Sequence, residues 1–78
     1  MNSAYEKQIG QKIRELRMEQ GLSQDQLSAQ MQIRGCNVSR SALAKIEVGQ
    51  RHLYPDEIRI LKEILKTTYD ELFSSGIL

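Results

Sequence analysis

The 78-residue sequence contains one cysteine, one histidine, one proline and no tryptophan. A lone cysteine, Cys36, forms no disulfide within the chain. One cysteine with one histidine does not supply the four ligands of a structural zinc site. These shortages exclude a disulfide scaffold and a zinc-built fold, and they favour a cytoplasmic protein. We expect neither a metal nor a cofactor.

Long apolar runs are also missing. No stretch approaches the roughly 20 apolar residues of a membrane helix. The opening residues, Met1-Asn2-Ser3, are polar and unlike a targeting signal. We therefore expect no membrane partner. The length fits one compact domain over residues 1–78, with its core within about 5–73.

Charge of one sign does not dominate the chain, whose net charge is +1. Residues 1–54 hold eight Lys or Arg against five Asp or Glu, and residues 55–78 hold three against five. Two interpretations stay open. The first part faces phosphate groups, or the whole chain has an ordinary mixed surface.

Apolar residues recur at helical spacing, and no segment alternates as a strand does, so we predict an all-helical fold. The first helix presents one apolar face and ends near Gly21. That face consists of Tyr5, Ile9, Ile13 and Leu16. The second helix begins at Ser23, which forms a capping box with Gln26. Its expected inward residues are Leu27 and Met31, with Ala29 and Ile33 as further candidates.

Three further helices are predicted after the break at residues 34–37. Ser39 caps a short third helix with the apolar stripe Ala42, Leu43 and Ile46. Pro55 suits the first turn of a fourth helix. The inner face of that helix consists of Ile58, Leu61, Ile64 and Leu65. Thr68 and Glu71 form a capping box ahead of Leu72 and Phe73 in a short fifth helix.

The third helix has a small, polar outward face. Its outward residues are Arg40, Ser41, Ala44 and Lys45. Small side chains let a helix approach base edges in a groove about 12 Å wide, and arginine pairs with guanine through two hydrogen bonds. The alternative is that these side chains are simply solvated, and periodicity alone does not decide between the two.

Several runs resemble the phage repressor and Cro helix-turn-helix family, also called the XRE type. They are Ile13-Arg14-Glu15-Leu16-Arg17, Gly21-Leu22-Ser23-Gln24, the segment from Ser39 to Arg51, and Tyr69-Asp70-Glu71-Leu72-Phe73. The resemblance implies a five-helix, lambda-repressor-like domain. It also implies a sequence-specific regulator of transcription, a repressor for example, that binds double-stranded DNA and is not an enzyme.

The resemblance also implies roles for individual residues. Gln24 would bond a phosphate, or it is only a first-turn residue. The groove-facing positions are Ser39, Arg40, Ser41 and Lys45. Gln50 and Arg51, with His52 as a further candidate, would lie near the DNA backbone. Arg17 and Glu47 would form a structural ion pair between the first and third helices.

The sequence departs from the family at three places. Gln32 to Asn37 lengthens the second helix, the turn after it, or both. Lys66 stands where glycine is usual, which predicts a different end for the fourth helix. Ala44 offers no hydrogen bond to a base.

Two functions remain open. The first is a regulator that binds DNA as a homodimer, with the apolar tail from Leu72 to Leu78 as part of the interface. The alternative for Leu72 and Phe73 is that they close the core of the monomer. The second is a protein-interaction module, antitoxin or adaptor of the same fold with weak DNA binding. No carboxylate pair, Cys/His pair or phosphate loop indicates an enzyme, and no small-molecule ligand is expected.

Overall fold

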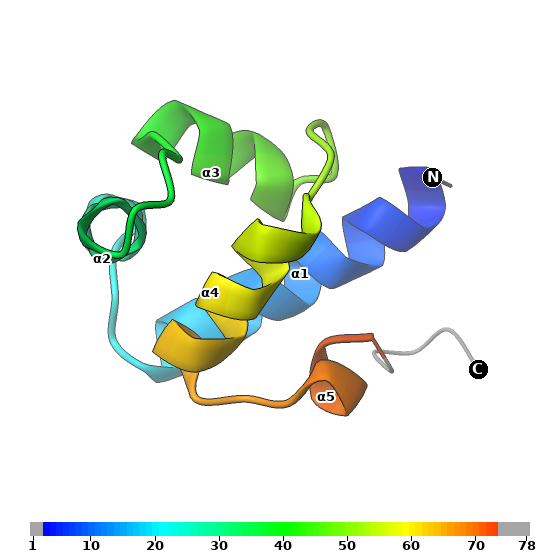
Figure 1. The fold of residues 1–78 in the computed structure, drawn as a ribbon. Coiled ribbons are helices and arrows are strands. Elements are labelled where there is room, and N and C mark those ends of the chain that lie inside the picture. Colours follow the sequence, from blue (N-terminus) through cyan, green and yellow to red (C-terminus); the bar gives the residue numbers. More distant parts are fainter. Residues whose placement is uncertain (1–2, 74–78) are drawn as a thin grey trace.

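The computed structural model describes residues 3–73, with side chains from residue 4 onward. It contains five helices within that range (Figure 1). They are α1 (Ser3–Glu19), α2 (Gln24–Ile33), α3 (Arg40–Glu47), α4 (Pro55–Leu65) and α5 (Tyr69–Phe73). No strand occurs between residues 3 and 73. The predicted all-helical, five-helix fold is confirmed.

Two layers of helices position the outward face of α3. In Figure 1, α4 crosses in front of α1, while α3 lies at the top and α2 is seen almost end-on beside it. Helix α1 contacts α3, α4 and α5, and α2 packs on α3 and α4. Helix α3 is therefore held from two sides by α1 and α2, which fixes its direction relative to the rest of the molecule.

One apolar core draws residues from all five helices and from the α2–α3 turn. Its buried members are Ile9, Ile13, Leu16, Leu27, Met31, Cys36, Val38, Leu43, Ile46, Ile60, Leu61, Ile64, Leu65 and Leu72. Leu22, Ala42, Leu53, Ile58 and Phe73 pack against it and are partly buried. Most of the predicted inward residues belong to these two groups.

Three predicted core residues lie outside. Tyr5 is 37% exposed, and the neighbouring Glu6 is buried instead. Ile33 is 84% exposed because it is the last residue of α2, and Ala29 is also exposed on that helix. The prediction was wrong at these positions because helical periodicity places residues on a face but does not show how far the covering helices extend.

Most predicted helix ends are confirmed by hydrogen bonds. Gly21 has φ 71°, and its amide and that of Leu22 donate to carbonyls of the last turn of α1. Ser23 and Gln26 form the predicted capping box. The Ser39 hydroxyl accepts from the amide of Ala42 at the start of α3. Pro55 is at the start of α4.

The end of α4 corrects another prediction. Lys66 does not change the helix end; it adopts the left-handed conformation itself, with φ 56° and ψ 46°. The amide of Thr67 donates to the carbonyl of Lys62, as in a glycine-terminated helix. The backbone geometry of this turn is therefore set by the surrounding packing, and lysine accepts a conformation that glycine adopts without strain.

The longer connection between α2 and α3 is divided between helix and turn. Gln32 and Ile33 belong to α2, and residues 34–39 connect α2 to α3, with Gly35 at φ 84°. The turn is pinned from inside, because the Ser28 hydroxyl donates to the carbonyl of Val38 at 2.7 Å. Val38 itself is completely buried. The insertion is thus an ordered part of the fold.

The last helix closes the core. Leu72 is 1% exposed, and Phe73 packs partly buried against the core. Of the two alternatives for these residues, the structure supports closure of the monomer core, with α1 packed on α5. The remaining tail residues, 74–78, lie outside the described residues.

Candidate nucleic-acid interface

Helix α3 separates its anchoring residues cleanly from its outward ones. Leu43, Ile46 and Glu47 are buried, whereas Arg40, Ser41 and Lys45 are exposed. Ala44 is partly buried between the two groups. Ser39 is exposed, and its hydroxyl is engaged in the cap. The four expected groove-facing residues therefore lie on one accessible surface at and after the start of α3.

Arg40 has an acidic neighbour on α2, Asp25. Its Nε lies 3.7 Å from Oδ1 of Asp25 on α2, and the two side chains are 67% and 76% exposed. An ion pair so exposed contributes little to stability. The pair therefore leaves the guanidinium able to exchange Asp25 for another acceptor. An acidic residue in the first turn of α2 was visible in the sequence, but its proximity to α3 was not.

Glu47 joins three helices through one buried carboxylate. Arg17 on α1 donates from Nε at 2.7 Å and from Nη2 at 3.1 Å. Gln24 on α2 donates from Nε2 to Oε1 of Glu47 at 3.1 Å. Arg17 also donates to the carbonyl of Leu22 at 2.7 Å. The end of α3 is thereby fixed to α1 and to the start of α2.

One of the two side-chain N–H groups of Gln24 has no acceptor among the described residues. A side-chain amide has two N–H groups, and Gln24 makes one side-chain hydrogen bond, to Glu47, within residues 3–73. The residue is partly buried at the start of α2. The hydrogen bond to Glu47 orients the amide, so its second N–H has a defined direction. The resemblance pointed to Gln24, but it did not point to this partner.

The loop after α3 uses Arg51 internally. Arg51 donates to both carboxylate oxygens of Glu57, at 2.8 and 2.9 Å, and to the carbonyl of His52. Burial alone would raise the pKa of Glu57, but the hydrogen bonds from Arg51 and from the Tyr54 amide outweigh it and lower that pKa. The hydrogen bond to Glu57 raises the pKa of Arg51 further. The structure therefore brings Arg51 to the start of α4.

Gln50 and His52 flank Arg51 and are exposed. The His52 ring contacts the carboxylate of Glu6, a buried residue near the start of α1. This contact ties the loop to α1. Gln50 lies at the surface between α3 and the loop. Its backbone N–H donates to the carbonyl of Lys45 at 2.8 Å.

Cys36 belongs to the core. The residue is buried in the α2–α3 turn. Burial, and after it the negative charges of Glu57 and Asp56, raise the pKa of the Cys36 thiol. A thiol is nucleophilic as its thiolate, so a raised pKa disfavours a reactive role. The burial of Cys36 in the apolar core supports a packing role for this side chain.

No group of three or more metal-binding side chains occurs between residues 3 and 73. None of the helices in that range is both long enough and apolar enough to cross a membrane.

Comparison with known families agrees with this geometry. A family model described as helix-turn-helix matches residues 13–72, from the middle of α1 into α5. The protein belongs to the helix-turn-helix family. The match covers more than half of the chain and is of the XRE or Cro-like type, a DNA-binding family rather than an enzyme family. Neither the curated proteins nor the solved structures gave a match to this helix-turn-helix chain.

Proposed function

We propose that this helix-turn-helix protein is a sequence-specific regulator of transcription that reads the major groove of double-stranded DNA with α3. The observation that carries the proposal is the division of α3 into two faces. Leu43, Ile46 and Glu47 are fixed in the core, while small and cationic side chains face outward. A helix of this kind fits the major groove and places its first turn against base edges.

Each outward residue has a role that follows from its chemistry. Arg40, in the first turn, can donate two hydrogen bonds to a guanine. Lys45 lies five residues later, more than one helical turn away, so it reaches a neighbouring base or a phosphate. Ser39 and Ser41 add short hydroxyl groups beside Arg40. Ala44 leaves a gap that allows close approach of the helix.

Backbone contacts would come from the two ends of this surface. Gln24 offers its second amide N–H at the start of α2, and Gln50 lies in the loop after α3. Arg51 donates instead to Glu57, so we assign it to shaping the loop. Contacts with phosphate position a protein on DNA but carry no sequence information directly.

One α3 helix contacts too few base pairs to specify an operator alone. We therefore infer that the protein binds as a homodimer on an inverted repeat, as a repressor would. Two reading helices would then lie about 34–36 Å apart, one turn of DNA.

Selection from a random pool of DNA duplexes tests the proposal. The expected result is one enriched motif, arranged as two inverted half-sites with centres about 10 base pairs apart. A pool carried through the same rounds without protein is the control. A protein-interaction module of the same fold would enrich no motif, and that result would contradict the proposal.

A further inference from the structure

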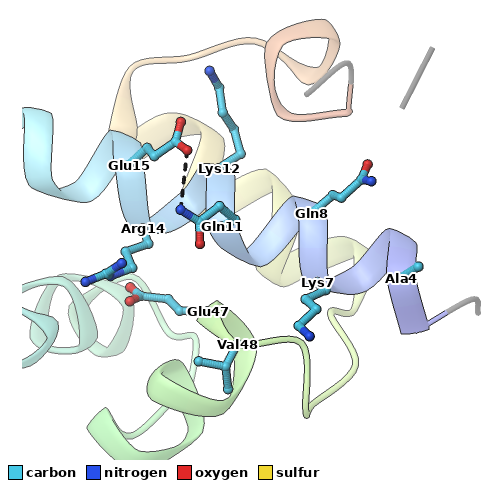
Figure 2. Close-up of a pocket in the computed structure, with 9 residues that line it drawn as sticks. All are labelled: Ala4, Lys7, Gln8, Gln11, Lys12, Arg14, Glu15, Glu47 and Val48. Carbon is cyan, nitrogen blue, oxygen red and sulfur yellow. Dashed lines mark hydrogen bonds between the residues drawn. The ribbon is translucent and has the colours of Figure 1, made fainter. Parts of the chain in front are cut away.

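A groove of 780 Å³ lies between α1 and the end of α3, beside the outward face described above (Figure 2). Lys7, Gln11 and Arg14 line its α1 side, and Glu47 and Val48 line its α3 side. Val48 is half exposed at the end of α3. Lys45 lies three residues before Val48, so we expect its side chain near the α3 side of the groove.

Two glycines, Gly10 and Gly49, let the backbones on the two sides of the groove come into contact. Gly10 packs against the backbone carbonyls of Ile46 and Glu47, where a side chain would collide. A Cβ placed on Gly49 would lie 2.7 Å from Cα of Lys7. The backbones of α1 and of the α3 end are therefore in direct contact. Side chains on this part of α1 consequently keep a constant position relative to the reading helix.

Three cations line the groove, and two of them have no ion pair. Lys7 and Arg14 are exposed, and in the described part of the chain no carboxylate oxygen lies within 4 Å of their cationic nitrogens. The third, Lys12, lies 3.9 Å from the carboxylate of Glu71. The carboxylate of Glu47 is already matched by Arg17. Glu15, at the rim, is the opposing charge, and it accepts a hydrogen bond from Gln11.

We propose that this groove seats the DNA phosphate backbone next to the bases that α3 reads, with Lys7 and Arg14 as its cationic contacts. The proposal rests on the proposed function and extends its contact surface to α1. Lys7 and Arg14 lie seven residues apart, which is about 10 Å along a helix. Two cations at that distance suit two separate phosphates of a nucleic-acid strand rather than a single anion.

The test compares salt dependence of binding in two double variants. Lys7→Ala/Arg14→Ala removes the proposed contacts, and both residues are exposed. Arg34→Ala/Arg59→Ala is the matched control, because it removes the same number of positive charges elsewhere on the surface. The guanidinium groups of Arg34 and Arg59 lie 3.7 and 3.4 Å from the carboxylate of Glu63. Fluorescence anisotropy would give the affinity for the selected duplex and for a random duplex between low and moderate salt.

The plot of log affinity against log salt concentration should become less steep by about 1.8 for Lys7→Ala/Arg14→Ala, since each lost phosphate contact removes about 0.9. Both duplexes should lose affinity by the same factor, and the preference between them should survive. Glu15→Gln should raise the affinity for both. A slope equal to that of the control variant would overturn the proposal for the groove.

The two proposals fail in different ways. A wild-type protein that shows no preference between the duplexes contradicts sequence-specific function, yet its slope still reports on the groove. A preserved preference with an unchanged slope contradicts only the groove. A wild-type protein that binds neither duplex at low salt overturns both.

Discussion

Lys66 ends α4 in the left-handed conformation, which costs an L-amino acid roughly 1–2 kcal/mol. The turn nevertheless forms with the hydrogen bonds of a glycine-terminated helix. The free energy of the rest of the fold therefore holds this residue in place. A single backbone dihedral stores strain here that no side-chain contact reveals.

Replacing Lys66 with glycine should raise the free energy of unfolding by about 0.5–1 kcal/mol. The gain from relieved strain exceeds the entropy that glycine adds to the unfolded chain. Urea denaturation would measure it. Lys66→Ala is the control, because it removes the same exposed side chain but keeps the Cβ. Equal effects of the two substitutions would show that the side chain, and not the backbone, matters.

The hydrogen bonds of Glu57 make the stability of the fold depend on pH. Its pKa in the folded protein is lowered, so its bonds with Arg51 and the Tyr54 amide stabilise the fold above the unfolded pKa of about 4.3. That contribution is lost as the pH falls through the folded pKa. Glu57→Gln should therefore cost about 1–3 kcal/mol near pH 7 and much less near pH 3. A difference that is constant from pH 3 to pH 7 would contradict the assignment.

At the scale of elements, Glu47 connects α1, α2 and α3. Removing one partner of a buried ion pair leaves the other charge without compensation, at a cost of about 3–5 kcal/mol. Glu47→Gln should therefore destabilise the fold severely. Joint replacement, Arg17→Met with Glu47→Leu, should restore much of the loss because no buried charge remains.

Thermal unfolding of the single and double variants measures this coupling. Circular dichroism suffices as the signal, because every element is helical. The double variant should unfold at a higher temperature than Glu47→Gln. If the losses of the single variants Arg17→Met and Glu47→Leu add up to the loss of their double variant, Arg17 and Glu47 stabilise the fold independently.

The elements were predictable wherever the signal is local. Helical spacing and caps such as Ser23 and Ser39 depend on residues within one turn of each other, and the structure confirms them. The contacts of Asp25 with Arg40 and of His52 with Glu6 were missed, because they depend on how helices approach. Arg17 and Glu47, 30 residues apart, were expected only through the family resemblance.

At the scale of the whole molecule, the described residues form a closed monomer core, with Leu72 inside it. An inverted-repeat site therefore needs an interface other than Leu72. We predict that the fraction of selected duplex bound rises cooperatively with protein concentration. Analytical ultracentrifugation with duplexes containing one or two half-sites measures the number of chains bound. One chain on the two-half-site duplex would contradict the homodimer.

We propose above that α3 reads the DNA sequence and that Arg40 contacts a base directly. The decisive measurement is the affinity of wild-type protein and Arg40→Ala for the selected duplex and for each single-base variant of a half-site. If Arg40 contacts a guanine, the substitution should cost about 1–3 kcal/mol and abolish discrimination at one base pair only. Gln24→Ala, the control, should weaken binding to all of these duplexes alike. A uniform loss for Arg40→Ala, with discrimination intact at every position, would contradict the claim.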